Sequence, residues 1–314
     1  MAEAIFNQPH FQDADKAREY LEALRWANGV TCPHCGTLDG HYKLQGKATR
    51  PGVYKCGSCS DQFTVTVGTV FERSKVGLHL WMQAVHLVSA SKKGMSAKQL
   101  ERMLGVTYKT AWFMSHRIRE AMKDDPTWTL GGNGTSGIVE ADETYWGNRN
   151  DVPKGIRGYE HTMKLVSLVE RHGEKRTFHV ANVTAETARA VLKSQVNPAA
   201  HLMTDEALVY KKVGREFAEH STVNHGAKEY ARGRVSTNTI ESSFAILKRG
   251  LQGTFHSVSE KHLQRYANEF DFRWNYRSAL GYNDVNRADV ALKQIAGKRL
   301  TYRRIGGKST QAFA

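Results

Sequence analysis

Two spacings of apolar residues divide this chain at about residue 137. Before that point, apolar side chains recur every three to four positions, the periodicity of a helix with one buried face. After it, apolar runs of strand length alternate with helical segments. We expect β-ribbon segments between residues 42 and 67, and helices over 13–26, 78–91, 96–104 and 107–119.

The second half of the pattern predicts a mixed sheet covered by helices. Strands are expected over 137–142, 164–170, 177–183, 201–205 and, as a short last strand, 222–225. A helix over 184–195 precedes the fourth strand. Three antiparallel strands, a helix and a parallel strand follow one another in the ribonuclease H-like order. A helix from Asn238 is expected to pack across the sheet, followed by a loop over 253–259 and a helix over 260–277.

Four cysteines form two Cys-x-x-Cys pairs, each able to present two thiolates to one ion. Cys32 and Cys35 make the first pair and, twenty residues later, Cys56 and Cys59 make the second. The spacing predicts one structural Zn²⁺ with four cysteine ligands and no open position. Disulfides are the alternative, which an intracellular location disfavours. His34, inside the first pair, is left out of the ligand set.

The charge balance is strongly basic: 45 lysines and arginines against 31 acids, a net charge of +14. Such an excess predicts a polyanionic partner, by default nucleic acid; a basic surface without a partner is the alternative. The first eighteen residues are mixed and polar, unlike a signal peptide. Because no apolar run approaches the roughly 20 residues that span a bilayer, we expect a soluble, cytoplasmic protein with no membrane partner.

A helix-turn-helix is predicted where Gly105 and Val106 separate two helical segments. Ser96 suits the N-cap of the first helix. The second helix starts with polar residues, as recognition helices do when their N-terminal residues meet DNA bases. The residues expected to face DNA are Tyr108, Lys109, His116 and Arg119. A plain helical hairpin without a DNA role is the alternative.

Three acids fall on the strands and helix of the second half. Asp142 ends the first strand, Asp205 ends the fourth, and Glu241 lies in the first turn of the helix that follows. Thirty-five residues separate Asp205 from Glu241, and Lys248 comes seven after Glu241 on the same helix face. Carboxylates are the hard ligands that two Mg²⁺ (or Mn²⁺) ions need for phosphodiester chemistry. The arrangement resembles the D-D-35-E pattern of transposases and retroviral integrases.

Neighbouring residues leave other interpretations open. Glu140 shares the strand face of the first aspartate and is its main rival as a metal ligand, whereas alternation puts Glu143 on the opposite face. With Asn238 as N-cap, Glu241 fits a capping box, and Lys248 is then an ordinary charge near a helix C-terminus.

The chain resembles bacterial insertion-sequence transposases of the 1595 family over about residues 5–280. The motifs that carry the resemblance are Cys-Pro-His-Cys-Gly at 32–36, Asp-Glu-Thr-Tyr at 142–145, Asn-Thr-Ile-Glu at 238–241, Lys-Arg-Gly at 248–250, and Glu-Phe with Phe-Arg at 269–273. One departure is Ser236, where histidine is expected before Thr-Asn-Thr in many relatives.

The resemblance implies a DDE transposase that binds the terminal inverted repeats of its own element, cleaves the ends and joins the 3′-hydroxyls to target DNA. We expect Asp142 to bridge both metal ions, and Asp205 and Glu241 to hold one each. Lys248 and Arg249 are expected to bind double-stranded DNA, and joining two ends calls for a homodimer or larger synaptic complex. A ribonuclease H-like nuclease or resolvase, or a domesticated DNA-binding regulator, stays open as the alternative.

The predicted fold class is α/β, with a ribonuclease H-like mixed-sheet catalytic domain preceded by a zinc ribbon and a helix-turn-helix domain. Four parts are expected: an N-terminal helix and zinc ribbon, a helix-turn-helix region, the DDE catalytic domain and a basic tail. Their bounds are 1–74, 75–130, 131–290 and 291–314. The tail is expected either to touch DNA or simply to be solvated.

Overall fold

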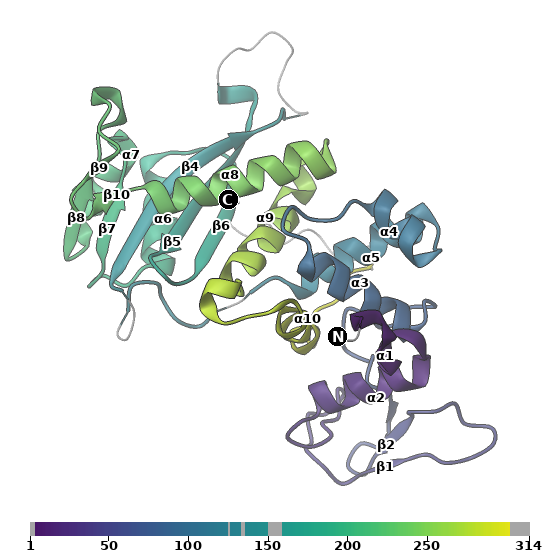
Figure 1. The fold of residues 1–314 in the computed structure, drawn as a ribbon. Helices are drawn as coiled ribbons and strands as arrows, with labels where there is room; N and C mark the ends of the chain where they lie inside the picture. The colour runs from purple at the N-terminus through teal and green to yellow at the C-terminus, as the bar shows by residue number, and fades with distance from the viewer. Residues whose placement is uncertain (1–3, 125, 133–135, 150–158, 302–314) are drawn as a thin grey trace. The chain divides into compact units, whose positions relative to one another are not determined.

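The computed structural model describes residues 4–124, 126–132, 136–149 and 159–301 of the 314-residue chain. The chain divides into two units. The first runs to Met122 and resumes at Tyr282, and the second runs from Lys123 to Gly281. Figure 1 shows the helices and strands of both.

Helices make up most of the first unit. They are a 3-10 turn η1 (Ile5–Asn7) and the helices α1 (Pro9–Gln12), α2 (Ala14–Arg25), α3 (Leu78–Ala90), α4 (Ala97–Leu104), α5 (Tyr108–Ala121) and α10 (Asp284–Lys293). The four helices expected from the apolar spacing are α2 to α5 and are confirmed. α10 packs against α3, where Arg287 Nη1 donates to the carbonyl oxygen of Ser89 over 3.1 Å. This helix therefore belongs to the first unit, although the sequence places residues up to 290 in the catalytic domain.

α4 and α5 form the expected helix-turn-helix. The hydroxyl of Ser96 accepts from the N–H of Gln99 over 3.2 Å and caps α4. Thr107 caps α5 in the same way, through the N–H of Thr110 at 3.3 Å. Between them, Gly105 has φ 65°, in the left-handed region where a side chain is strained. The sharp turn therefore depends on this glycine.

The rest of the first unit is a small antiparallel ribbon of strand order β1-β2-β3. Its strands are β1 (His41–Lys43), β2 (Tyr54–Cys56) and β3 (Gln62–Phe63). Phe63 is buried and its ring lies 5.8 Å from that of Tyr54 and 6.0 Å from that of Trp26, at the end of α2. Residues 64–67, expected to be strand, form a turn closed by a 3.0 Å bond from the N–H of Val67 to the carbonyl of Thr64.

The second unit is built on a five-stranded sheet of order β6-β5-β4-β7-β8. The strands are β4 (Ile138–Trp146), β5 (Met163–Glu170), β6 (Lys175–Val180), β7 (His201–Thr204) and β8 (Glu219–Thr222), with a separate ribbon of β9 (Ala231–Arg232) and β10 (Val235–Ser236). β4, β5 and β6 pair antiparallel, and β7 pairs parallel with both β4 and β8. This is the ribonuclease H-like order, so the predicted fold class is confirmed.

The last strand lies three residues earlier than expected. Residues 222–225 were the predicted strand, but the chain turns at Asn224, whose side-chain oxygen accepts from the N–H of Ala227 over 2.9 Å. The turn continues into the short 3-10 helix η4 (His225–Ala227). The backbone carbonyl of Asn224 accepts from the N–H groups of Ala227 and Glu229, at 3.1 and 2.9 Å, and is thus used within the turn, whereas the ladder ends at Thr222.

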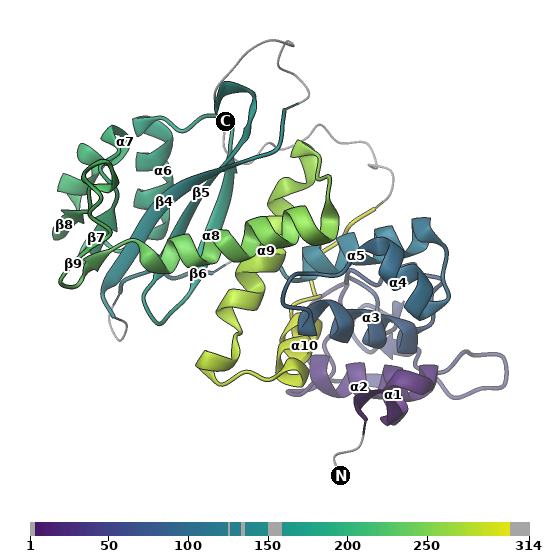
Figure 2. The same ribbon diagram turned by 45° about the horizontal axis from the view of Figure 1, so that its top comes forward.

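Helices cover both faces of the sheet (Figure 1 and Figure 2). The helical segments of this unit are α6 (Ala185–Gln195), α7 (Leu208–Lys211), α8 (Asn238–Gly250), a π-helical turn η5 (Leu251–Phe255), α9 (Glu260–Asn275) and the 3-10 turns η2 (Tyr159–His161), η3 (Val213–Glu216) and η6 (Ser278–Leu280). α6 packs on one face, against a core that includes Val139, Ala141 and Val166. α8 and α9 pack on the other, over Met163, Leu165 and Val169. The expectation that the Asn238 helix crosses the sheet is confirmed.

α8 is longer than expected at its C-terminal end. The sequence predicts a loop over 253–259, yet the π-helical turn η5 continues the helix to Phe255. Leu247 and Leu251 are both fully buried in the core beneath α8 and α9. Burying this pair favours continuing the helical path by one more turn, since the apolar stripe persists beyond Gly250.

Candidate active site and zinc ribbon

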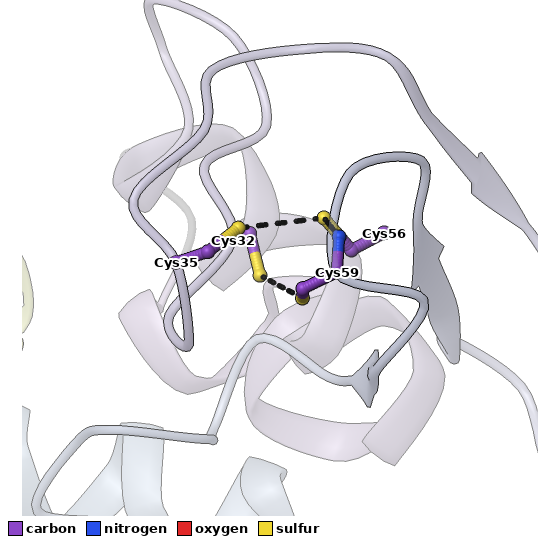
Figure 3. Close-up of side chains that lie close together, drawn as sticks. All are labelled: Cys32, Cys35, Cys56 and Cys59. Atoms are coloured by element: carbon purple, nitrogen blue, oxygen red, sulfur yellow. Dashed lines mark hydrogen bonds between the residues drawn. The ribbon is translucent and has the colours of Figure 1, made fainter.

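The four cysteines come together in the ribbon (Figure 3). Their sulfur atoms all lie within 4.8 Å of one another, with Cys32 Sγ 3.8 Å from Cys59 Sγ and Cys35 Sγ 3.6 Å from Cys56 Sγ. Sulfur atoms about 2.3 Å from a tetrahedral zinc ion stand about 3.8 Å apart. The four thiols therefore fit one structural Zn²⁺, and His34 is exposed and outside the group.

One thiol of the group is already biased toward the anion. A hydrogen bond with the hydroxyl of Thr37, at 3.2 Å, lowers the pKa of Cys35 to about 6. The thiolate is the form that ligates zinc. The local environment of Cys35 therefore favours the protonation state in which a cysteine ligates zinc.

The three acids of the second unit approach one another on the face of the sheet that α8 covers. Asp142 lies on β4, and Asp205 follows directly after β7, the parallel neighbour of β4. Glu241 is in the first turn of α8, which packs over β4 and β5. Two adjacent strands and a crossing helix thus bring together residues that are far apart in the sequence.

The electrostatics of Asp142 show that these carboxylates act on one another. Burial raises the pKa of Asp142 to about 8, and repulsion from Asp205, Glu143 and Glu241 adds to the rise. Burial also raises the pKa of Asp205. Carboxylates kept close in a poorly solvated place retain a proton unless a cation compensates their charge. The site is therefore suited to binding divalent metal.

An oxygen-only donor set fits Mg²⁺ or Mn²⁺ better than softer metals. Among the residues that the structure describes, the cysteines form the one group with three or more ligand atoms within 4.8 Å of one another. Carboxylate oxygens of Asp142, Asp205 and Glu241 are the donor set that the sequence predicts for divalent metal.

Glu140, the rival on the same face of β4, has a different role. Its side chain is fully buried. The carboxylate accepts hydrogen bonds from Arg171 Nε at 2.7 Å, Thr239 Oγ1 at 2.9 Å and the N–H of Ile240 at 2.9 Å. Since Thr239 and Ile240 begin α8, Glu140 holds the N-terminus of the helix that carries Glu241. Its oxygens are committed to the protein, so Glu140 anchors the first turn of the helix.

Arg171 extends this anchor to the chain before α8. Its guanidinium donates to the carbonyl oxygen of Arg234 at 2.6 Å, and to the carbonyl and hydroxyl oxygens of Ser236 at 3.0 and 2.8 Å. Ser236 is the position where the sequence departs from the family expectation. The serine hydroxyl accepts from Arg171, so the local hydrogen bonding is satisfied without a histidine.

The glutamates that follow the two aspartates also bond to protein groups. Glu143 points to the opposite side of the sheet, as strand alternation predicts, and accepts from the buried hydroxyl of Tyr210 at 2.7 Å. Glu206 accepts from the backbone N–H groups of His225 and Gly226, both at 2.9 Å. Both glutamates therefore support the structure beside the aspartates.

Glu241 does not form the capping box that its spacing allows. α8 begins at Asn238, and the N-cap is Thr237. The Thr237 hydroxyl donates to Glu241 Oε1 over 2.8 Å, and His225 Nε2 lies 3.2 Å from the same oxygen. Sequence reasoning missed both partners, because His225 comes from a turn that the apolar pattern presents as a strand.

Comparison with known proteins agrees with this geometry. The ISXO2-like transposase domain model matches residues 134–275, and the transposase zinc-ribbon domain model of the same family matches residues 12–62. The chain belongs to the IS1595 family of DDE transposases. A protein of Halobacterium salinarum, described as an uncharacterized protein in transposable element ISH50, is 29% identical over 283 residues, which are 84% of this chain and 91% of that one. This relative is archaeal, so the bacterial origin expected from the sequence stays a prediction.

A solved structure also aligns with the transposase. It is a chain of a pre-cleavage Mos1 transpososome, 13% identical, matched over 86% of this chain and 92% of that chain with a TM-score of 0.20. So low a score carries no argument, and the fold assignment rests on the strand order of the sheet. None of the helices that the structure describes is long and apolar enough to cross a membrane.

The residues expected to contact DNA fall into two groups. Lys248 and Arg249 are exposed on α8 downstream of Glu241. Tyr108 and Lys109 are exposed at the start of α5, where Lys98 Nζ lies 5.6 Å from the Tyr108 ring. These four positions are open to a phosphate or a base.

His116 and Arg119 are not open to DNA in this structure. Their exposed fractions are 1% and 2%. Residues 114–119 of α5 are all buried, so the second half of this helix has no outward face, and the ring of His116 lies 4.2 Å from that of Trp112. The expectation that these two side chains face DNA is therefore wrong for this conformation, because the helix is amphipathic only in its first half.

Proposed function

We propose that this IS1595-family chain is an active DDE transposase that cleaves the terminal inverted repeats of its element and joins the 3′-hydroxyls to target DNA. The observation that carries the proposal is the carboxylate cluster. Asp142 has its pKa raised to about 8 by burial and by the acids around it. Such a cluster destabilises the fold unless it binds cations, and perturbed acids of this kind concentrate at functional sites.

In this proposal the carboxylates of Asp142, Asp205 and Glu241 would together hold the divalent metal. When bound, such metal would activate the attacking water or DNA 3′-hydroxyl and stabilise the leaving oxygen. The chain supplies fixed positions for the ligands: two adjacent strands hold the aspartates, and the Glu140 anchor holds the first turn of α8.

DNA contacts in the proposal come from exposed cations and from the N-terminal modules. Lys248 and Arg249 bind phosphates of the DNA end, because they are exposed on the helix that carries Glu241. Tyr108 and Lys109 of the helix-turn-helix, together with the zinc ribbon, recognise the terminal repeats. The net charge of +14 favours this polyanionic partner. Two ends must meet in one reaction, so a homodimer or larger synaptic complex is expected.

Cleavage and joining of labelled element ends by the zinc-loaded protein test the proposal. We expect Mg²⁺ or Mn²⁺ to support both steps and Ca²⁺ to support end binding without cleavage. Efficient cleavage with no divalent ion other than the retained zinc would contradict it. Nicking without any joining would favour the nuclease or resolvase alternative. End binding without cleavage in any metal would favour a domesticated regulator.

A further inference from the structure

The carboxylate of Glu241 is held from one side only. The hydroxyl of Thr237 donates to Oε1 over 2.8 Å, and His225 Nε2 lies 3.2 Å from Oε1 and 3.2 Å from the Thr237 hydroxyl. Both interactions converge on the same oxygen. In the described part of the chain, no hydrogen bond or ion pair is made to Oε2 of Glu241. One oxygen is thus committed to the protein, and the other is left for a ligand.

The loop that presents His225 is itself fixed next to the second aspartate. Glu206, the residue after Asp205, accepts from the N–H groups of His225 and Gly226 at 2.9 Å each. Asn224 closes the same turn: its N–H donates to Glu229 Oε2 over 3.1 Å. Because Glu206 directly follows Asp205, these bonds fix the position of His225 relative to the end of β7.

We propose that Thr237 and His225 are positioning residues for Glu241, and that Glu206 links their placement to that of Asp205. This inference rests on the proposed metal-dependent function. The Thr237 hydroxyl donates to Oε1 and His225 Nε2 lies beside the same oxygen, so Oε2 would be the oxygen of Glu241 that is left to hold a divalent ion. Glu206 ties the loop of His225 to the strand end of Asp205, so the two single-ion ligands keep a fixed separation.

Glu241 needs positioning partners because its side chain is partly exposed. Its side chain is 42% exposed, so without partners it would sample several rotamers before metal arrives. Ordering a long acidic side chain costs on the order of 1 kcal/mol or more of rotamer entropy. Partners that fix a ligating carboxylate before metal binds remove this cost from the binding step, and losing such a partner typically weakens metal binding about 10–100-fold.

Mn²⁺ binding to the full-length, zinc-loaded protein, followed by electron paramagnetic resonance, tests the proposal. Thr237→Val keeps the side-chain shape and removes the hydroxyl, whereas Thr237→Ser keeps the hydroxyl. His225→Ala removes the ring, whereas His225→Gln retains an N–H near the position of Nε2. We expect Thr237→Val and His225→Ala to lower the affinity for one of two Mn²⁺ ions about tenfold. Thr237→Ser and His225→Gln should bind both Mn²⁺ ions nearly as tightly as wild type.

Kinetics give an independent readout that a purely structural role would not produce. In cleavage assays we expect the Mg²⁺ concentration for half-maximal rate to rise by the same factor in His225→Ala, with a smaller change in kcat at saturating Mg²⁺. Glu206→Ala removes the carboxylate that holds the backbone of His225 and Gly226, and it should raise the half-maximal Mg²⁺ concentration as well. His225 is partly exposed, so its variants keep the test informative even if the buried Thr237→Val protein unfolds.

Two outcomes overturn the inference while leaving the proposed function intact. One is a His225→Ala protein that binds both Mn²⁺ ions as tightly as wild type. The other is weaker Mn²⁺ binding in Thr237→Val or His225→Ala that is equally present in Thr237→Ser or His225→Gln, since the contacts with Oε1 would then not position Glu241. A wild-type protein that binds no Mn²⁺ and cleaves no DNA overturns the proposed function itself, and the inference with it.

Discussion

Replacing Asp142 by asparagine should make the metal-free protein more stable while it abolishes DNA cleavage. Asparagine keeps the shape of the side chain and the oxygen that accepts from the N–H of Glu143 at 2.7 Å. It removes the charge that burial and the neighbouring acids oppose. A residue whose removal stabilises the fold is retained for function, because selection for stability alone would discard it.

The magnitude follows from the pKa. An ordinary aspartate titrates at 3.8 and Asp142 at about 8, so the folded protein keeps its proton over a range where the unfolded chain has lost it. Each pH unit of difference corresponds to about 1.4 kcal/mol, which sets a ceiling on the order of 5 kcal/mol at pH 8. Water reaching the site lowers this ceiling, and we expect Asp142→Asn to raise the free energy of unfolding by about 2 kcal/mol or more.

The direction of the Asp142 pKa shift determines how the stability of the protein depends on pH. Because the pKa of Asp142 is raised, this residue does not lower the free energy of unfolding below about pH 4, and it lowers that free energy increasingly as the pH rises toward 8. We therefore expect the stabilisation by Asp142→Asn to grow from pH 5 to pH 8. The opening free energy of β4 and β5, measured by amide hydrogen exchange in buffer free of Mg²⁺, reports on this sheet alone.

Glu140→Gln is the matched control on the same face of β4. It leaves the guanidinium of Arg171 without its buried anion, and breaking such a pair typically costs about 3–5 kcal/mol. We expect this variant to be destabilised, opposite in sign to Asp142→Asn. An Asp142→Asn protein less stable than wild type at pH 8, or with an unchanged pH dependence, would refute the reasoning.

Two further predictions concern the zinc ribbon and the DNA end. Cys56→Ser removes one of four zinc ligands and should release zinc and lower end-specific binding, while Mg²⁺-dependent nicking of non-specific DNA persists. His34 lies outside the sulfur cluster, so His34→Ala should change neither zinc content nor end binding. Measuring zinc content and end binding for both variants checks this prediction. Lys248→Ala should weaken end binding by about tenfold in gel shifts, with an unchanged melting temperature. Lys212 is an exposed lysine elsewhere in the second unit, and Lys212→Ala should leave end binding unchanged. If Lys248→Ala binds DNA ends as tightly as wild type, Lys248 is an ordinary surface charge.

The features predicted correctly from the sequence depend on local patterns. Strand order, the helix-turn-helix and the cysteine cluster each follow from periodicity, caps or spacing within a short stretch. The opposite faces of Asp142 and Glu143 follow from strand alternation alone.

The features that sequence reasoning missed depend on contacts between distant segments. Glu140 and Asp142 share a strand face, and the bonds that Glu140 accepts from Arg171, Thr239 and Ile240, all distant in the sequence, separate their roles. The burial of His116 and Arg119 results from tertiary packing that a helical pattern does not reveal. His225 meets Glu241 because a turn held by Glu206 replaces the expected strand.

Glu241→Gln tests the central claim most directly. Glutamine keeps the length of the side chain and an oxygen that accepts from Thr237, but it lacks the charge that holds a divalent ion. Cleavage and joining of labelled element ends in Mg²⁺ should be measured beside end binding by the same protein. The account predicts normal folding and end binding with neither cleavage nor joining. A Glu241→Gln protein that cleaves and joins ends like wild type would contradict it.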